Sequence, residues 1–254
     1  MTELCFALIG EVHKARVGSR DRTQIFAMNY LKRYQSGEYE QVWAELQALG
    51  PDVRNESNYP QALEVATETM RRVRGNCELI VSRLTSVGYH FGLYPDGTKY
   101  SNPDPLVGPS RESRVSIIYL EREAGPLPLS LVAFWQEVGT VDLIGMHPGW
   151  PTSLDPLVVY PPEATESCLD DYEDELFGVL APDDLHKDNV SGGEPYGFEL
   201  PSPSADFILM NEDHNLLFVQ YLRMAILQWG GFPGLERLPR FEPLSKLVAG
   251  LEPF

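Results

Sequence analysis

The densest group of side chains that could do chemistry lies between residues 163 and 188. Ten of these residues are acidic, and Lys187 is the one lysine among them. Carboxylates at this density favour encounter with a basic partner and oppose the approach of anions. Aromatic side chains in the same segment are of the kind that anchor interfaces. We therefore predict a partner-binding surface whose contact residues are Asp170, Asp171, Tyr172, Glu173, Asp174, Glu175, Phe177, Asp183 and Asp184.

Two other interpretations of this acidic segment stay open. A solvated loop without a partner would have the same composition. Carboxylate oxygens are also the ligands of calcium and magnesium. However, the run "DDYEDE" lacks the alternating Asp pattern, the glycine turn and the distal Glu of a calcium loop, and "DDLHKD" has a lysine beside its histidine. We predict no metal site and no cofactor.

Motifs for catalysis are scarce in this sequence. Ser191 precedes two glycines, but the chain has no Gly-x-Ser-x-Gly elbow and no phosphate-binding glycine loop. None of the five histidines is paired at i, i+4 as a zinc-binding helix requires. We predict that the protein is not an enzyme. A hydrolase that uses Ser191 with His186 or His214 remains an alternative, because triads assemble in space.

The excess of negative over positive charge lies entirely in the second part of the chain. Of the 254 residues, 1–92 hold 11 Lys/Arg and 11 Asp/Glu, whereas 93–254 hold 9 and 26, so the whole net charge of -17 lies after residue 92. A field of this sign repels nucleic-acid backbones and anionic lipid surfaces. We predict a protein partner, basic in character, and no direct binding of nucleic acid or membrane.

The remaining composition is that of a soluble protein. No segment reaches the roughly 18 uncharged apolar residues of a membrane helix, and the N-terminus has no basic-then-apolar signal pattern. The three cysteines are widely spaced, and none forms a Cys-x-x-Cys pair. These features predict a cytoplasmic location, without a disulfide framework or a zinc knuckle.

Apolar periodicity predicts helices in the first part of the chain. Residues 60–87 have apolar side chains at alternating steps of three and four, and shorter patterns of this kind occupy 23–34 and 38–49. We interpret 1–92 as an all-α unit with an internal core; a dimerising coiled coil is the alternative. Prolines and glycines in 93–112 predict a linker.

Helices bracket short strands in the second part, residues 113–254. The first helix is expected at 113–125, packing through Val115, Ile118 and Leu120, with a strand as the alternative. A second helix begins at Pro128 and ends at Gly139, and a last one extends from a cap at Asn215 to Gly230. Strands are expected at 140–145, 155–161, 175–182, 196–201 and 205–212. This order predicts an α+β domain with a mostly antiparallel sheet.

The stretch "IIYLEREAGPLPLSLVAFWQEVGTVDLIG" and the later "NLLFVQYLRMAI" resemble the SUKH superfamily over about residues 112–230. In that superfamily a helix with a Leu-Glu pair leads through a proline-marked loop to an amphipathic helix and the first strands of a sheet. The Asn-Gly-Gly usually found after the amphipathic helix is replaced here by "VGTVDLIG". The resemblance implies a non-enzymatic bacterial protein, often the immunity partner of a secreted toxin.

These observations together predict a non-catalytic protein that binds a basic partner, such as a toxin, through its acidic segment. Two alternatives belong to other functional classes. One is a housekeeping interaction module without a toxin partner. The other is an uncharacterised hydrolase or metal-dependent enzyme, which would need polar groups that converge in a pocket. The oligomeric state does not follow from the sequence.

Overall fold

The computed structural model describes residues 29–100, 102–169 and 177–254. Its longest element is α3, Tyr59–Ser86, which has Pro60 in its first turn. The predicted apolar seam is buried over most of this helix, at Ala66, Met70, Val73, Cys77, Ile80 and Leu84. The preceding elements are α1, Tyr30–Gln35, α2, Tyr39–Ala48, and the short 3-10 helix η1, Gly50–Arg54.

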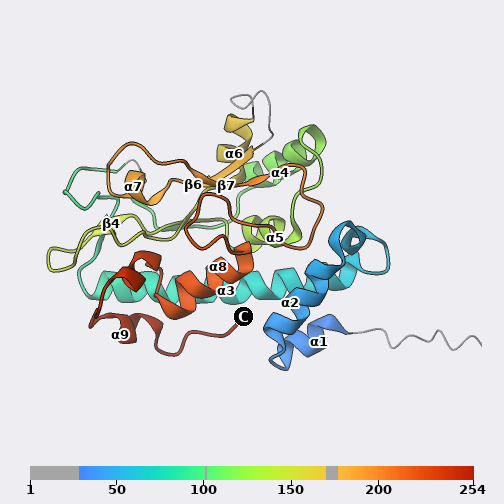
Figure 1. Cartoon of the computed structure of the whole chain (residues 1–254), viewed down its shortest axis with the longest axis horizontal. Helices are drawn as coiled ribbons and strands as arrows, with labels where there is room; N and C mark the ends of the chain where they lie inside the picture. Colours follow the sequence, from blue (N-terminus) through green and yellow to red (C-terminus); the bar gives the residue numbers. More distant parts are fainter. Residues whose placement is uncertain (1–28, 101, 170–176) are drawn as a thin grey trace, which may run out of the picture.

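Helix α3 is the central support of the molecule. It runs along the long axis in Figure 1, with α1 and α2 toward one end. It packs against α1, against α5 (Leu129–Glu137) and against α9 (Leu244–Val248). One continuous hydrophobic core extends from Tyr30 to Phe254. A separate N-terminal helical unit is therefore not confirmed, because α3 buries its apolar seam against the rest of the same chain.

The strands form small antiparallel sheets beside this helix. The predicted linker contains β2, Leu106–Val107, which pairs with the central strand β3, Thr140–Asp142. The other partner of β3 is β5, Val158–Val159. Strand β1, His90–Phe91, pairs with β4, Gly145–Met146. Strand β6, Phe177–Ala181, pairs with β7, Tyr196–Glu199. The fold is α+β with antiparallel strands flanked by helices, as predicted.

The prediction for the inner face of α4, Arg111–Glu123, is confirmed at Leu120 and wrong at Val115 and Ile118. Val115 and Ile118 are 61% and 68% exposed, and the buried residues of this helix are Ser113, Ser116, Ile117 and Leu120. The reason is the contact with α6, Pro162–Cys168, where the Ser113 hydroxyl donates to Glu163 at 3.0 Å. Ser113 faces this neighbour, and Val115 and Ile118 are exposed.

Helix α5 begins and ends where the sequence predicts. It follows Pro128, is buried along most of its length, and is followed by Gly139 at φ +90°. A Cβ atom at Gly139 would lie 2.2 Å from the carbonyl oxygen of Val107. The β2 backbone therefore packs directly on this glycine, which both ends the helix and lets β3 pair with β2.

The last long helix ends where the sequence predicts, before Gly230, but it begins later than predicted. Helix α8, Phe218–Arg223, has Leu217 as its cap residue, whereas the predicted cap Asn215 lies outside the helix in a left-handed turn at φ 52°. It continues as the π-helical turn η2, Met224–Gln228, and stops before Gly230. The strand expected at 205–212 forms only isolated bridges, from Ile208 to Leu217 and from Met210 to Gly197. The short helix η3, Pro233–Arg237, follows.

A buried hydrogen bond joins α2 to α3. The indole N–H of Trp43 donates to the Thr69 hydroxyl at 3.0 Å, and that hydroxyl donates to the Val65 carbonyl at 2.8 Å. Thr69→Val keeps the shape but leaves the indole N–H buried without an acceptor. We expect this change to lower the free energy of unfolding by about 1–2 kcal/mol, measured by urea denaturation. Thr85→Val is the matched control, because Thr85 makes the same bond to Val81 on an exposed turn of the same helix. Equal losses in both variants would contradict the expectation.

Candidate functional site

The predicted contact residues divide into those that the structure describes and those that it does not. Asp170, Asp171, Tyr172, Glu173, Asp174 and Glu175 lie outside the described residues. Phe177 begins β6 and pairs with Glu199 of β7, and its ring lies against Gly197. Asp183 and Asp184 lie at the start of the short helix α7, Asp184–Lys187. The described part of the predicted surface is therefore centred on α7.

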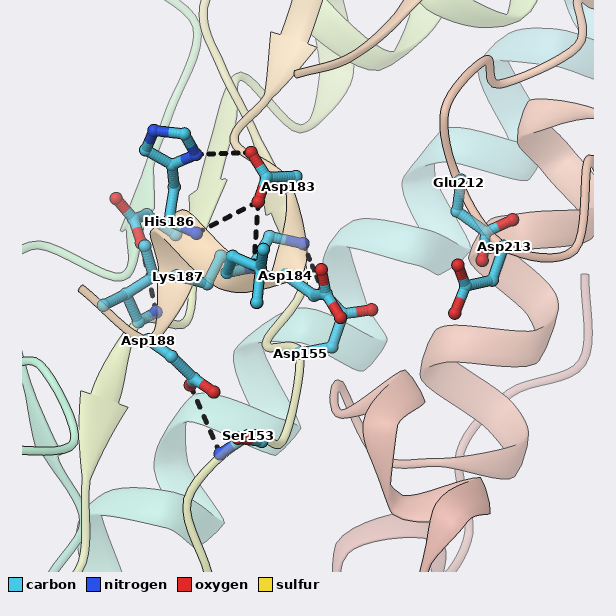
Figure 2. Close-up of polar contacts among 12 residues, drawn as sticks. Ser153, Asp155, Asp183, Asp184, His186, Lys187, Asp188, Glu212 and Asp213 are labelled. Atoms are coloured by element: carbon cyan, nitrogen blue, oxygen red, sulfur yellow. Dashed lines mark hydrogen bonds and ion pairs between the residues drawn. The ribbon is translucent and has the colours of Figure 1, made fainter. Parts of the chain in front are cut away.

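Asp183 holds the start of α7 in place. Its carboxylate accepts from the backbone N–H groups of Leu185 and His186 at 2.9 and 3.1 Å, and it also contacts the His186 ring (Figure 2). These hydrogen bonds lower the pKa of Asp183 against the opposing effect of its burial. Because Asp183 is only 4% exposed, its side chain positions the helix and offers little surface to a partner.

A buried ion pair anchors the other side of α7. The Lys187 ammonium donates to Asp155 at 2.6 Å, and the side chains of these residues are 0% and 6% exposed. The ammonium also lies 4.5 Å from the centre of the Tyr196 ring, within the range of a cation–π interaction. In Figure 2 the Lys187 side chain points toward Asp155 and away from the His186 ring. The one lysine of the acidic segment is thus neutralised inside the protein and does not reduce the negative charge that a partner would meet.

Asp184 faces outward and belongs to a surface pair of carboxylates. Arg237 of η3 lies between Asp184 and Asp213, with its guanidinium nitrogens 3.1 and 2.6 Å from their oxygens. Figure 2 shows that Asp213 comes from a different segment of chain from α7. The side chains of Asp184 and Asp213 remain 34% and 64% exposed. Both carboxylates can therefore contact another molecule from their fixed positions.

His214 connects two more carboxylates beside this pair. Its Nδ1 lies 2.6 Å from Oε1 of Glu212, and its Nε2 lies 2.9 Å from Oε2 of Glu236 in η3. Glu212 is almost completely buried, whereas the side chain of Glu236 is 34% exposed. Hydrogen bonds to Glu212 and then to Glu236 raise the pKa of His214 above its ordinary value of 6.5.

The end of α7 is surrounded by acidic groups as well. Asp188 accepts from the backbone N–H of Ser153 at 3.2 Å, and burial raises the pKa of this aspartate. Asn189 donates to Asp96 of the 93–100 loop at 3.2 Å. The side chains that surround α7 and keep solvent exposure form a set that we name the α7 acidic cluster: Asp96, Asp184, Asp188, Asp213 and Glu236.

A small pocket adjoins the end of α7. Its volume is about 30 Å³, and its lining includes His147, Trp150, Ser153 and Asp188. This volume has room for about one water molecule. Within the described residues, no three His, Cys, Asp or Glu side chains are arranged to share a metal ion.

His186 and Asp183 have the arrangement of a histidine with its orienting carboxylate, which is part of the geometry that a serine hydrolase needs. In the described part of the chain, no hydrogen bond joins the His186 ring to Ser191 or to another hydroxyl. The ring nitrogens of His214 contact Glu212 and Glu236, so neither histidine is hydrogen-bonded to Ser191 among the described residues.

Asp184 is the one member of the α7 acidic cluster among the predicted contact residues, and Asp188 lies in the acidic segment 163–188 but outside that set. Asp96, Asp213 and Glu236 are far from the acidic segment along the chain and do not belong to a charged run as dense as 163–188. Asp96 contacts Asn189, which follows α7, Asp213 shares Arg237 with Asp184, and Glu236 precedes Arg237 in η3. Such contacts depend on the tertiary fold, so no local pattern could have revealed them.

None of the helices in residues 29–100, 102–169 and 177–254 combines the length and apolar character needed to cross a bilayer. Comparison of the chain with models of protein families, with curated proteins and with solved structures found no match in any of the three.

Proposed function

We propose that this chain is a non-catalytic protein that binds a basic protein partner through the α7 acidic cluster. The observation that carries the proposal is the convergence of exposed carboxylates from separate segments on α7. Among the described residues, the basic side chains in contact with these groups are Arg237 and His214, whereas the carboxylates number six when Glu212 is included. The surface therefore keeps a negative charge after its internal pairs are counted, and a complementary partner presents lysines and arginines.

The way in which the carboxylates are held supports a binding role. Hydrogen bonds and ion pairs fix Asp184, Asp213 and Glu236 before a partner arrives. Preorganised side chains lose less conformational entropy on association than mobile ones do. The buried pair of Lys187 and Asp155 supports the helix from below. The resemblance to SUKH immunity proteins narrows the proposed partner to a basic toxin.

Neutralising the cluster tests this proposal. The partner is first captured from a lysate of the source organism with the purified protein as bait, at low and high salt, and identified by mass spectrometry. For the triple variant Asp184→Asn, Asp213→Asn and Glu236→Gln, we expect the association rate constant at low salt to fall by roughly tenfold, because electrostatic steering is lost. The salt dependence of that rate constant should become weaker.

A matched variant separates the local effect from the effect of net charge. Glu56, Glu64 and Glu112 are exposed and lie on η1–α3 and α4, so their triple change to Gln alters the net charge by the same amount. We expect this variant to retain most of the association rate. If both triple variants associate equally fast, the partner does not bind at the α7 acidic cluster, and the proposed surface is wrong.

A further inference from the structure

The environment of His214 requires a particular protonation state. Both ring nitrogens face carboxylates, Nδ1 at 2.6 Å from Glu212 and Nε2 at 2.9 Å from both oxygens of Glu236. A neutral imidazole has one N–H and one lone pair, so it could donate to only one of these two acids. The other carboxylate would then face the lone pair at hydrogen-bond distance. The imidazolium, which donates from both nitrogens, is the form that fits this geometry.

The remaining groups around His214 are a buried carboxylate, an ion-paired set and two buried phenols. Glu212 also accepts from the backbone N–H of His214 at 3.0 Å, so its buried carboxylate is held by this loop. Nearby charges are Asp213, Asp184 and Arg237, which already form an ion-paired set. From β7 and α8, the phenols of Tyr196 and Tyr221 lie within electrostatic reach of Glu212, and burial raises the pKa of each so that both stay neutral.

We infer that His214 is a pH-operated clasp, whose imidazolium ties the 211–215 loop to η3 and whose loss of a proton releases Glu236 to a basic partner. This inference rests on the proposed function of the α7 acidic cluster. When His214 is neutral, the surface has one positive charge fewer, and Glu236 no longer has a charged partner. Binding of a cationic surface should therefore strengthen as the pH rises through the titration of His214.

The charge of His214 can be measured without any partner. The ring carbon and proton signals are followed by NMR over a pH titration of the whole chain, and the His214 signal is assigned by its loss in His214→Gln. We expect a midpoint clearly above the ordinary 6.5, and a lower midpoint in Glu236→Gln, which removes one of the two charged acceptors. A midpoint at or below 6.5 in the unmodified chain would overturn the clasp.

A binding experiment forms the second arm of the test, after the NMR titration. It uses an oligolysine peptide as the probe, because its ammonium groups stay charged to about pH 9. Its affinity at low salt should rise by about two- to fivefold between about pH 6 and about pH 8.5, an effect of the size of one surface charge. His214→Gln should remove this rise. His186→Gln is the matched control and should keep it, because the acid that the His186 ring contacts among the described residues is the buried Asp183.

The outcomes of the two arms distinguish the two proposals. A rise that persists unchanged in His214→Gln would overturn the clasp and leave the α7 acidic cluster as a binding surface. Absence of oligolysine binding at both pH values would count against that surface and against any regulation of it. In that case the NMR midpoint would still decide whether His214 is charged in the folded protein.

Discussion

Replacing Lys187 by Ala should lower the free energy of unfolding by about 3–5 kcal/mol, the cost of leaving one partner of a buried ion pair without the other. The Lys187 side chain is 0% exposed and lies 2.6 Å from Asp155, whose side chain is 6% exposed. Without the ammonium, the Asp155 carboxylate stays buried with its charge unpaired. Urea denaturation followed by circular dichroism measures the effect.

Two comparisons identify the cause of this loss. In the double variant Lys187→Met with Asp155→Asn, both charges are gone, and we expect much of the lost stability to return. Asn is chosen because Asp155 has φ 48°, a backbone conformation that Asn tolerates better than most residues. Lys246→Met removes an exposed lysine and should change the stability by no more than about 0.5 kcal/mol. A double variant that is as unstable as Lys187→Ala would show that packing, not the unpaired charge, causes the loss.

Stability should fall as the pH rises from about 5 to about 7.5, since two buried aspartates resist ionisation. Burial raises the pKa of Asp206 and of Asp142 from 3.8 to about 6. A carboxyl whose pKa is higher in the folded state favours folding below its unfolded pKa, and this contribution is lost as the pH passes the folded pKa. Between these two pH values the free energy of unfolding falls by about 1.4 kcal/mol for each aspartate and by about 3 kcal/mol for both.

Other ionisable groups do not reverse this trend. The hydrogen bond from Arg33 lowers the pKa of Glu45 to about 2, so its stabilising effect is complete above the ordinary value of 4.5 and does not vary across the window. The pKa of His214 is raised in the folded protein, so this residue also lowers the free energy of unfolding as the pH rises through the upper end of this range. The net charge of -17 adds repulsion between ionised groups as the pH rises. Thermal unfolding at a series of pH values measures the sum of these effects.

Substitution of the two aspartates separates their contribution from general charge repulsion. Asp206 accepts from Ser130 and from the backbone N–H of Val219, and an Asn side chain retains one of these acceptor positions. Asp206→Asn and Asp142→Asn should each flatten the pH dependence, whatever their effect on stability itself. Asp104→Asn, which removes an exposed carboxylate, should leave the slope nearly unchanged. Identical slopes in all the variants would show that the buried carboxyls are not responsible.

Local sequence determined the elements whose signals lie within a few residues. The apolar steps of α3 and the Pro128 and Gly139 that bound α5 predicted both helices, because capping and amphipathic burial act over one or two turns. The α+β class followed from the order of helices and short strands. By contrast, the face of α4 was predicted correctly at Leu120 and incorrectly at Val115 and Ile118, since the packing of α6 against α4 contributes to which residues are buried. Hydropathy alone favoured the apolar residues Val115 and Ile118.

The candidate site also combines properties that the sequence alone determines with properties that depend on the tertiary structure. Composition by itself determined that the second part of the chain is acidic and that Asp183 and Asp184 belong to its densest run. Only the tertiary structure decided that Asp183 is a buried cap, that Lys187 is neutralised inside, and that Asp213 and Glu236 join Asp184 at the surface. Net charge is a sum over residues and needs no coordinates. Burial and pairing depend on which distant segments meet, and the packing of the whole core sets those contacts.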